Sequence, residues 1–591
     1  MKRSLSLLLS LFVLASMVLA ACGGSSTATQ APAAPAEPTQ AAEQPAAPAE
    51  PTQAAEPTPV PDVPVATFDG KSLVVPAEEC NGDYAGLFQA IEAVDDYTVK
   101  FTLCRPDPAF LSKIAFSPFA IYPSEWLEKT AANGKRTSEG LEKPIGTGPY
   151  QISEWKRGES VNFTAFDGYW GEKPFAKTLV LRWQSEAAAR LLELQAGTVD
   201  GIDNVGPADF EVVAADPNLT LVEREALNIF YIGMTNTFKP WDDVRVRKAI
   251  AYGIDRQRIV DNFYPAGSEV ASHFTPCSIP NGCVGDPWYD FNPEEGRKLL
   301  AEAGFPDGFK TKLYYRDVVR GYLPQVANVA QDVQAQLKQN LNIDAEIVVM
   351  ESGAFIEAST TGKLDGLYFL GWGADYPHIT NFLDFHFGAS NPQFGNPFPE
   401  IYEKLTKGAQ IADPKQAEPI YVEANNAIRE LVPMVAVAHG GSGTAYRADV
   451  TTPQASPLTN EQFAVSNPGG RDVFVFMQNA EPISLFCADE TDGESLRACD
   501  QVMEALYGYE VNGTAVVPML AEVCEPNADL TVWTCTLRQG VKFHDGSDFT
   551  SADVVATFNM GLNIASPTHA GNTGVWEYYD YLWGLMKKPG K

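Results

Sequence analysis

The residue types that most often carry catalysis are present in this 591-residue chain, but they do not fall into catalytic patterns. No two of the six histidines have the HExxH spacing of a zinc hydrolase. The sequence GGSGT at residues 440–444 lacks the last glycine of a GxSxG nucleophile elbow. GTGPYQ at residues 146–151 is not a GxGxxG loop, and no GxxxxGK[ST] loop occurs. We therefore expect a protein that is not an enzyme and has no cofactor.

The cysteines point to structural disulfides. Cys22 stands alone near the N-terminus, and the other eight form four close pairs. An even number in an exported chain favours disulfides, although reduced, buried thiols are an alternative. No CxxC spacing occurs and histidine is rare, which disfavours zinc. A turn sequence at residues 526–529 would place the last pair opposite each other in a hairpin. The expected pairs are Cys80 with Cys104, Cys277 with Cys283, Cys487 with Cys499, and Cys524 with Cys535.

The N-terminus has the pattern of an export signal. Lys2 and Arg3 precede an apolar run at residues 5–20, and the run ends in LAAC at residues 19–22. This ending resembles the bacterial lipobox, in which the cysteine is lipidated and becomes the new N-terminus. We expect a lipoprotein signal peptide at residues 1–21 and lipidation of Cys22. A membrane-spanning helix is the alternative, because the run is nearly long enough.

Residues 22–65 are expected to form a disordered stalk. They consist mainly of Ala, Pro, Glu, Thr and Gln, and the sequence PAAPAEPTQAAE at residues 32–43 recurs at residues 45–56. This composition cannot bury enough apolar surface to offset its ordering entropy. The stalk would hold a body away from a membrane; an interaction motif is the less favoured interpretation.

The chain is acidic, with a formal net charge of −32, and only two basic and five acidic residues lie within residues 1–65. Proteins that bind nucleic acid normally present a basic face to phosphate, so this charge argues against that class. Residues 66–591 are too many for one hydrophobic core, so we expect several lobes.

Local patterns predict several elements. Asp242 or Asp243 can cap a helix whose apolar residues have helical spacing. Thr550 and Asp553 form a capping-box pattern, which makes the nearby His544 structural rather than a ligand. The other expected elements are a turn at residues 146–150, helices at 325–340 and about 551–561, and strands at 344–350 and 367–370.

Six segments together resemble the family 5 solute-binding proteins, which serve ABC importers of dipeptides, oligopeptides and nickel. Each segment alone is weak evidence, but the set covers most of the chain behind a lipobox. They are KPIGTGPY at 143–150, FDGYWG at 166–171, LQAGTVD at 194–200, WDDVRVRKAIAYGIDR at 241–256, GWGADYP at 371–377 and GVKFHDG at 540–546. The resemblance implies an α/β, two-lobed periplasmic-binding-protein-like (venus-flytrap) fold with an extra subdomain. Ligand would bind between the lobes and favour their closure.

The order of these segments departs from that of the family, in which the GVKFHDG-like segment comes early. We expect a circular permutation rather than a complete domain followed by a truncated one, because residues 66–440 and 471–591 do not repeat each other's motifs. Permutation predicts that the segments near Tyr446 and Val473 are neighbours in one lobe, and that those near Thr98 and Phe543 share another. Residues 583–588 would continue into residues 93–99. The implied parts are an extra subdomain at 66–140 and 515–591, a first lobe at 141–235 and 441–515, and a second lobe at 236–440.

The resemblance also suggests ligand-binding residues. In peptide binders of this class, the aspartate of the GWxADY-like motif pairs with the ligand's N-terminal ammonium, so Asp375 would be a charge-assisted anchor. The alternative is that Asp375 caps the turn before Pro377. Trp372 and Tyr376 would form an apolar wall or pack in the core, and Asn236 would lie where the chain crosses between lobes. Residues 367–370 lack the arginine by which some oligopeptide binders hold a ligand carboxylate, so the far anchor is unassigned.

The function implied by the resemblance is capture of di- or oligopeptides outside the cytoplasm and their delivery to an ABC transporter permease. The protein would be a monomer, lipid-anchored to the cell membrane at the periplasm or cell surface. Alternative ligands are oligosaccharides and nickel chelates, although His378 and His386 are only weak evidence and we expect no metal site. A sensory or adhesion lipoprotein and a secreted hydrolase are the competing classes.

Overall fold

The computed structural model describes residues 61–590. The expected signal peptide, Cys22 and nearly all of the expected stalk lie outside these residues. Within the described part, no helix is both long and apolar enough to cross a membrane.

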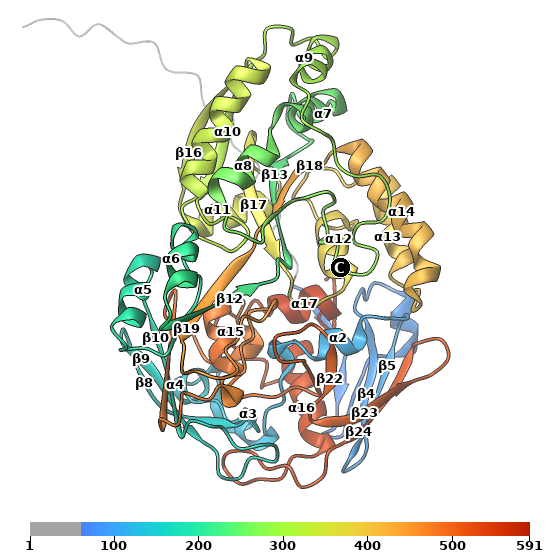
Figure 1. Cartoon of the computed structure of the whole chain (residues 1–591). Coiled ribbons are helices and arrows are strands. Elements are labelled where there is room, and N and C mark those ends of the chain that lie inside the picture. Colours follow the sequence, from blue (N-terminus) through green and yellow to red (C-terminus); the bar gives the residue numbers. More distant parts are fainter. Residues whose placement is uncertain (1–60, 591) are drawn as a thin grey trace, which may run out of the picture. The chain divides into compact units, whose positions relative to one another are not determined.

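Two large clusters of buried hydrophobic side chains define two lobes. Figure 1 shows the ribbon of both lobes. One cluster consists of residues between Leu227 and Ala438, and we call this part the second lobe. The other cluster joins residues 73–181 to residues 446–586. The first lobe and the extra subdomain each have a sheet of their own, but they share this second cluster of buried side chains.

The second lobe is built on a six-stranded sheet in the order β14-β18-β13-β17-β15-β16. β13 pairs antiparallel with β17 and β18, and β15 pairs parallel with β16 and β17. The strands are β13 (Asn228–Met234), β14 (Glu269–Val270), β15 (Lys310–Arg316), β16 (Asp344–Met350), β17 (Leu367–Gly373) and β18 (Met434–His439). The helices are α7 (Val244–Gly253), α8 (Arg256–Phe263), α9 (Pro293–Glu302), α10 (Val326–Leu341), α11 (Ser352–Thr360), α12 (Ile379–Phe387), α13 (Pro399–Gly408) and α14 (Pro414–Leu431).

The first lobe contains a seven-stranded sheet in the order β12-β19-β11-β20-β10-β9-β8. β20 pairs parallel with β10 and β11, so a strand from the C-terminal fifth of the chain lies in the middle of the sheet. The strands are β8 (Tyr150–Lys156), β9 (Ser160–Ala165), β10 (Thr178–Trp183), β11 (Gly201–Ile202), β12 (Leu219–Arg224), β19 (Ser442–Arg447) and β20 (Val473–Gln478). The helices are α5 (Ala187–Gln195), α6 (Phe210–Ala215) and α15 (Gly493–Cys499).

The extra subdomain has a six-stranded sheet in the order β2-β3-β4-β5-β24-β23, covered by α16. Its strands are β2 (Thr67–Phe68), β3 (Ser72–Val74), β4 (Phe88–Asp95), β5 (Thr98–Leu103), β23 (Ala521–Pro526) and β24 (Val532–Leu537). The helices of these two chain segments are α2 (Phe110–Ile114), α3 (Ser124–Thr130), α4 (Ser138–Glu142), α16 (Ser551–Leu562) and α17 (Glu577–Trp583). Short strand pairs are β1 (Val63–Pro64) with β25 (Lys587–Lys588), β6 (Ala131–Ala132) with β7 (Lys135–Arg136), and β21 (Tyr507–Tyr509) with β22 (Val516–Pro518).

Several predicted local features are confirmed. Thr550 and Asp553 form a capping box at the start of α16, and Asp243 caps α7. His544 is structural, because its Nδ1 accepts a hydrogen bond from the Gly146 amide at 3.3 Å and its Nε2 lies 3.0 Å from the Gly148 carbonyl.

All four expected disulfides are present in the structure. Cys80 is bonded to Cys104, Cys277 to Cys283, Cys487 to Cys499, and Cys524 to Cys535. The last pair lies where the turn at residues 526–529 was expected to place it, because Cys524 and Cys535 face each other in the hairpin of β23 and β24. These eight cysteines are therefore paired with each other rather than present as reduced, buried thiols.

Neighbours expected from the unusual segment order are also found. Gly201 of β11 pairs with both Tyr446 and Phe476, so β19 and β20 flank the same strand. β5 pairs with β24, and Phe543 is buried in the same cluster as the residues of β5. Residues 471–590 therefore do not form a separate unit; they complete sheets that residues 61–447 begin.

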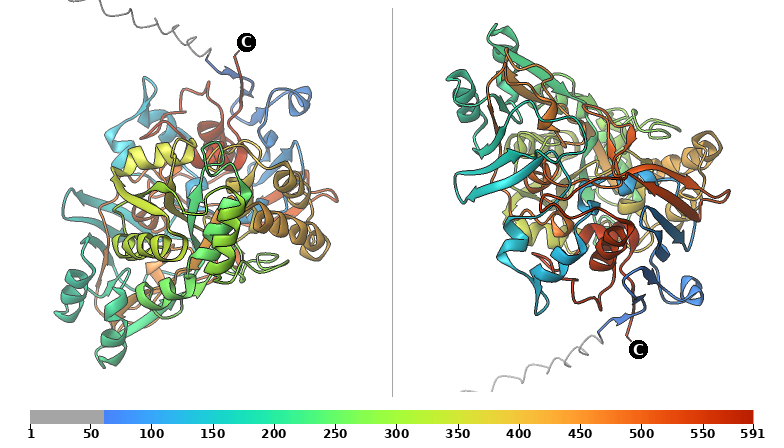
Figure 2. Two further views of the ribbon diagram at one scale, coloured as in Figure 1. Left: turned by 90° about the horizontal axis from the view of Figure 1, so that it is seen from above. Right: turned by 90° about the horizontal axis from the view of Figure 1, so that it is seen from below.

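The two ends of the described chain lie side by side. β1 and β25 pair antiparallel, with Val63 opposite Lys588, and Figure 2 shows the C-terminus next to this strand. Just before it, the Leu87 amide donates to the Trp583 carbonyl at 2.6 Å. The end of the described chain thus lies beside residues 63–65, and Trp583 contacts the residue that precedes β4, rather than residues 93–99.

One expected boundary is wrong. β13 lies in the sheet of the second lobe, whereas the expected first lobe extended to residue 235. The chain leaves the first lobe after Arg224 and returns between His439 and Ser442, because β12 and β19 pair with each other in the first-lobe sheet while β13 and β18 pair in the other.

Candidate functional site

The side chain of Asn228 joins the two chain crossings between the lobes. The Asn228 amide nitrogen donates to the Gly440 carbonyl at 2.7 Å, and its Oδ1 accepts from the Gly440 amide at 2.8 Å. Asn228 begins β13 and Gly440 follows β18, so the asparagine joins the outgoing and returning strands. The crossings are therefore fixed to each other at the point from which the lobes would open and close.

Asn236 does not lie at a crossing, contrary to the expectation from the sequence. It follows the opposite end of β13, where its amide donates to the Asn396 carbonyl at 2.8 Å and its Oδ1 accepts from the Asn396 amide at 2.7 Å. These two bonds use the side chain to hold a loop of the second lobe.

Four buried charged residues form a closed ring beside the crossings. Arg224 pairs with Asp203 at 2.8 Å and with Glu461 at 2.6 Å, and Arg497 pairs with the same two carboxylates, each at 2.8 Å. All four side chains are at most 4% exposed. Burial alone would raise the pKa of Asp203, but Arg497 and Arg224 hold this pKa well below its usual range. Arg224 also donates to Ser442 at 3.2 Å, which ties the ring to the second crossing.

Asp375 lies between β17 and α12, at the boundary between the lobes. Within the second lobe, Asn381 holds it from two sides: Oδ1 of Asn381 accepts from the Asp375 amide at 3.0 Å, and its Nδ2 donates to Asp375 Oδ2 at 2.9 Å. From the other side of the boundary, the hydroxyl of Tyr578 on α17 donates to Asp375 Oδ1 at 2.9 Å. The carboxylate thus meets groups from two chain segments that are far apart in sequence.

The surroundings of Asp375 contain donors but no paired cation among the described residues. Burial raises the pKa of this carboxyl to about 7, while the hydrogen bonds from Asn381 and Tyr578 oppose the rise. Glu577 adds a like charge and raises the pKa further. A cationic group placed beside Asp375 would therefore stabilise its ionised form, which is the electrostatic requirement for an ammonium anchor.

The structure separates the two aromatic candidates. Trp372 is half-buried, stacks on Phe385 with ring centroids 4.3 Å apart, and donates to Asn381 at 3.1 Å. Tyr376 is only 2% exposed and belongs to the buried cluster of the first lobe and extra subdomain, although its neighbours in sequence belong to the second lobe. It packs between the lobes as core.

Residues of α17 were missed by sequence reasoning. Tyr581 donates to the Asn381 carbonyl at 3.4 Å and packs edge-on against Phe385 at 4.7 Å between centroids. Together with Tyr578, it brings α17 into contact with the loop and helix that follow β17. The many aromatic residues in WEYYDYLW at residues 576–583 are the sequence feature that could have indicated these contacts.

The two histidines near this boundary have structural contacts. His378 caps α12 by accepting from the Thr380 amide at 3.3 Å, and Nδ1 of His386 lies 2.7 Å from the Phe382 carbonyl. Burial lowers the pKa of His378 to about 4 and that of His386 to about 3, so both are neutral near pH 7. Among residues 61–590, no group of three His, Cys, Asp or Glu side chains could hold a metal ion.

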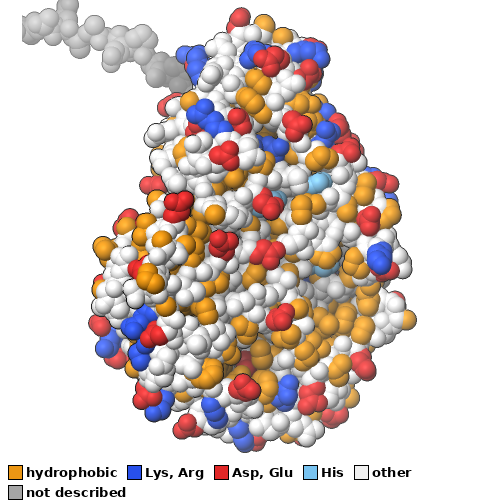
Figure 3. All heavy atoms as spheres, in the orientation of Figure 1, with side chains coloured by type: hydrophobic (Ala, Val, Ile, Leu, Met, Phe, Trp, Pro, Cys, Tyr) orange, Lys and Arg blue, Asp and Glu red, His pale blue; other side chains and the backbone are white. Residues whose placement is uncertain are grey.

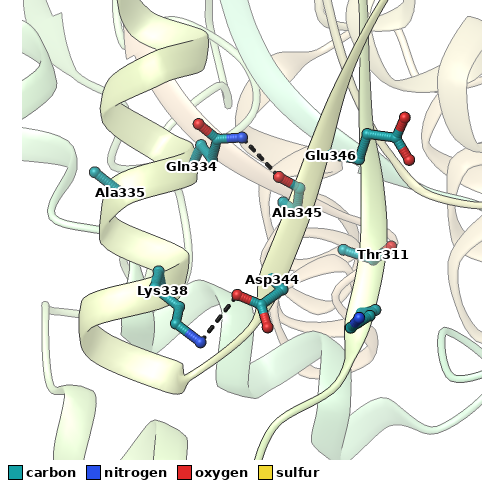
Figure 4. A pocket seen from close by; sticks show the side chains of 8 residues that line it. Thr311, Gln334, Ala335, Lys338, Asp344, Ala345 and Glu346 are labelled. Carbon is teal, nitrogen blue, oxygen red and sulfur yellow. Dashed lines mark hydrogen bonds and ion pairs between the residues drawn. The ribbon is translucent and has the colours of Figure 1, made fainter.

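Two surface hollows are lined by residues other than Asp375 and its contacts. One of about 530 Å³ lies between α10 and the edge of the second-lobe sheet, where Lys338 pairs with Asp344 at 2.9 Å and Gln334 donates to the Ala345 carbonyl (Figure 4). A second hollow, of about 570 Å³, is lined by residues around His544.

Figure 3 shows hydrophobic side chains gathered in the lower half of the visible face, around the positions of α2 and β22 in Figure 1.

Comparison with known proteins places this geometry in context. The model of the bacterial extracellular solute-binding proteins, family 5 (middle), matches residues 64–394 and 515–576. The dipeptide-binding protein of Escherichia coli is 30% identical over 386 residues, which are 64% of this chain and 71% of that protein. The heme-binding protein A of Haemophilus influenzae is 29% identical over 362 residues, covering 60% and 65% respectively.

The fold of this chain is similar to that of a solved dipeptide binding protein. The dipeptide binding protein from Pseudoalteromonas sp. SM9913, crystallised in complex with Met-Leu, is 25% identical and superposes with a TM-score of 0.55. The match covers 64% of this chain and 75% of that chain.

Proposed function

Because this chain belongs to family 5 of the bacterial extracellular solute-binding proteins, and so is a binding protein rather than an enzyme, we propose that it captures di- or oligopeptides between its lobes. It would deliver them to the permease of an ABC transporter. Relatives named for dipeptides, and a neighbour solved with Met-Leu, support peptides as the ligand class.

The observation that carries the proposal is the placement of Asp375. Its carboxylate lies at the lobe boundary, is partly buried and accepts hydrogen bonds from both sides. An N-terminal ammonium binding there would gain a charge-assisted hydrogen bond, worth roughly 1.5–3 kcal/mol. Trp372 would supply apolar contact next to this anchor.

The test compares peptides with free and blocked amino termini. Isothermal titration calorimetry with Ala-Leu should show a Kd about 10–100-fold weaker for Asp375→Asn than for the wild-type protein. N-acetyl-Ala-Leu should bind both proteins equally weakly. Asp365→Asn is the matched control, because Asp365 bonds Tyr314 and Lys312 within the second lobe. Equal binding of Ala-Leu by wild type and Asp375→Asn would reject the anchor, and binding of an oligosaccharide, nickel chelate or heme alone would reject the ligand class.

We also propose a lipid anchor at Cys22 and a monomeric body outside the cytoplasm. The support is the LAAC sequence at residues 19–22 and the relationship to extracellular solute-binding proteins. Cells grown in labelled palmitate should label the wild-type protein but not Cys22→Ala. An unlabelled wild-type protein, or equal labelling of the variant, would remove this part of the proposal.

Finally, we propose that the chain is a circular permutant of the family's usual order. β20 and β24, from the end of the chain, complete sheets formed by much earlier strands, and the described ends pair as β1 and β25. The family match in two pieces supports this relationship.

A further inference from the structure

A second group of polar side chains lies at the same boundary as Asp375. Asp107 precedes α2, which carries Lys113, and these two residues come from the segment before the first lobe. Asp384 on α12 and Tyr421 on α14 come from the second lobe. Burial raises the pKa of Asp384; Lys113 opposes this rise and Asp107 adds to it. Burial also raises the pKa of Tyr421, and the charges of Asp384 and Asp107 raise it further.

Lys113 is already paired and largely enclosed. Its ammonium lies 2.7 Å from Asp107 Oδ2, and the two side chains are only 12% and 9% exposed. The same nitrogen lies 5.3 Å from the ring centroid of Trp583 and 5.8 Å from that of Tyr376. Two aromatic rings therefore lie near this ammonium, and the low exposure of the ion pair reduces its screening by water.

Among the described residues, two buried polar atoms of Asp384 and Tyr421 in the second lobe lack hydrogen-bond partners. Oδ1 of Asp384 is inaccessible to solvent and has no hydrogen-bond partner among the described residues. The hydroxyl of Tyr421 is in the same state, and that side chain is only 2% exposed. Buried polar atoms are nearly always hydrogen-bonded in folded proteins, so an acceptor and a hydroxyl left unpaired at a ligand-binding boundary indicate a missing donor.

The charge balance specifies what kind of donor is missing. Asp107 and Asp384 are two acidic groups beside one ammonium, and burial raises the pKa of Asp384 to about 7. His378, which lies near the Asp107–Lys113 pair, is neutral because burial lowers its pKa to about 4. An anion bound to Lys113 would have to lie beside both carboxylates. A cation beside Asp384 would instead neutralise the group and donate to its free oxygen.

We propose that Asp384, with Tyr421 and the Asp107–Lys113 pair, forms a subsite for a cationic side chain of the ligand, so that peptides containing lysine or arginine bind preferentially. The inference rests on the proposed peptide-binding function. Tyr581 contacts residues beside both acidic positions: its hydroxyl donates to the carbonyl of Asn381, which holds Asp375, and its ring packs against Phe385, the neighbour of Asp384 in sequence. The ligand's amino terminus would bind Asp375, and its alkylammonium or guanidinium group would bind Asp384.

The test uses lysine and norleucine dipeptides, which differ in the terminal amine of one side chain. Titration calorimetry of the full chain with Ala-Lys and Lys-Ala should give at least one Kd about tenfold or more tighter than that of the matching norleucine peptide. Asp384→Asn keeps the size of the side chain and should bring this ratio close to one, while Asp365→Asn should leave it unchanged. Circular dichroism and thermal melting of each variant check that the fold is retained.

The outcomes separate this subsite from the proposed function. If lysine and norleucine peptides bind equally to the wild-type protein, or Asp384→Asn keeps the preference, peptide binding stands and the subsite is rejected. Cadaverine, a diamine without a peptide bond, is the third probe. If no peptide binds but cadaverine binds and loses affinity in Asp384→Asn, the cation subsite stands and the peptide function falls. If a dicarboxylate such as glutarate binds instead, or nothing binds, the subsite is rejected.

Discussion

The hydroxyl of Tyr578 donates a 2.9 Å hydrogen bond to Oδ1 of Asp375, joining α17 to the end of β17 across the lobe boundary. These residues are 203 positions apart in sequence. Under the proposed function, a ligand ammonium would bind the same carboxylate, so the tyrosine hydroxyl and the ligand would share or compete for it. Tyr578 is therefore part of the site even though it comes from the last segment of the chain.

Replacing Tyr578 with phenylalanine should destabilise the ligand-free protein by about 1–2 kcal/mol, because a buried carboxyl loses a donor. Chemical denaturation measures this change. Tyr581→Phe is the matched control: its hydroxyl lies on the same helix but makes only a long contact, 3.4 Å, to a backbone carbonyl. A Tyr578→Phe protein as stable as the control would show that the bond contributes little.

Dipeptide affinity should depend on pH through Asp375. Burial raises the pKa of this group to about 7, so lowering the pH from 7.5 to 5.5 protonates it and should weaken ammonium binding about tenfold or more. Asp375→Asn should not show this loss, and a wild-type profile that is flat over the same range contradicts the prediction. The effect on stability has the opposite sign: the folded protein holds a proton that the unfolded chain releases, so this carboxyl stabilises the fold less as pH rises from 3.8 to about 7.

Removing one member of the buried ring should be costly. Glu461→Ala leaves Arg224 and Arg497 with Asp203 as their remaining carboxylate in the ring, and we expect a loss of about 3–5 kcal/mol in the free energy of unfolding. Glu139→Gln is the comparison, because the Lys129–Glu139 pair is exposed and its loss should be hardly measurable. If both variants lose the same small amount of unfolding free energy, the buried ring does not stabilise the region of the chain crossings.

A chain rearranged to the family's usual order should fold. The rearranged chain has a short flexible linker from residue 590 to residue 61 and is opened between the exposed Gly469 and Gly470. These changes break no strand pairing, because β1 and β25 already lie together. Its melting temperature and ligand affinity should match those of the natural order. Opening the chain inside β24, between Cys535 and Thr536, should prevent folding. If the first rearranged chain fails to fold while the second folds, the proposed permutation is contradicted.

Short-range patterns were sufficient for many elements. The spacing of apolar residues predicted α10 and β16 to within one residue, since such periods depend only on neighbours along the chain. The capping box at Thr550 and the cysteine pairs were likewise readable from spacing. Asn236 and the boundary at residue 235 were wrong because the position where a chain changes sheets depends on strand pairing, which no local pattern specifies.

The sequence by itself determined the class of this protein, its acidic multi-lobed body, the family it belongs to, the disulfide pairs and the candidate carboxylate Asp375. Only the tertiary structure decided that Tyr578 contacts this carboxylate and that Tyr376 is core. It also decided that, among the described residues, Oδ1 of Asp384 and the hydroxyl of Tyr421 have no hydrogen-bond partner. The physical reason is that charge, period and spacing are properties of consecutive residues, whereas burial and unpaired polar atoms arise only when distant segments pack together.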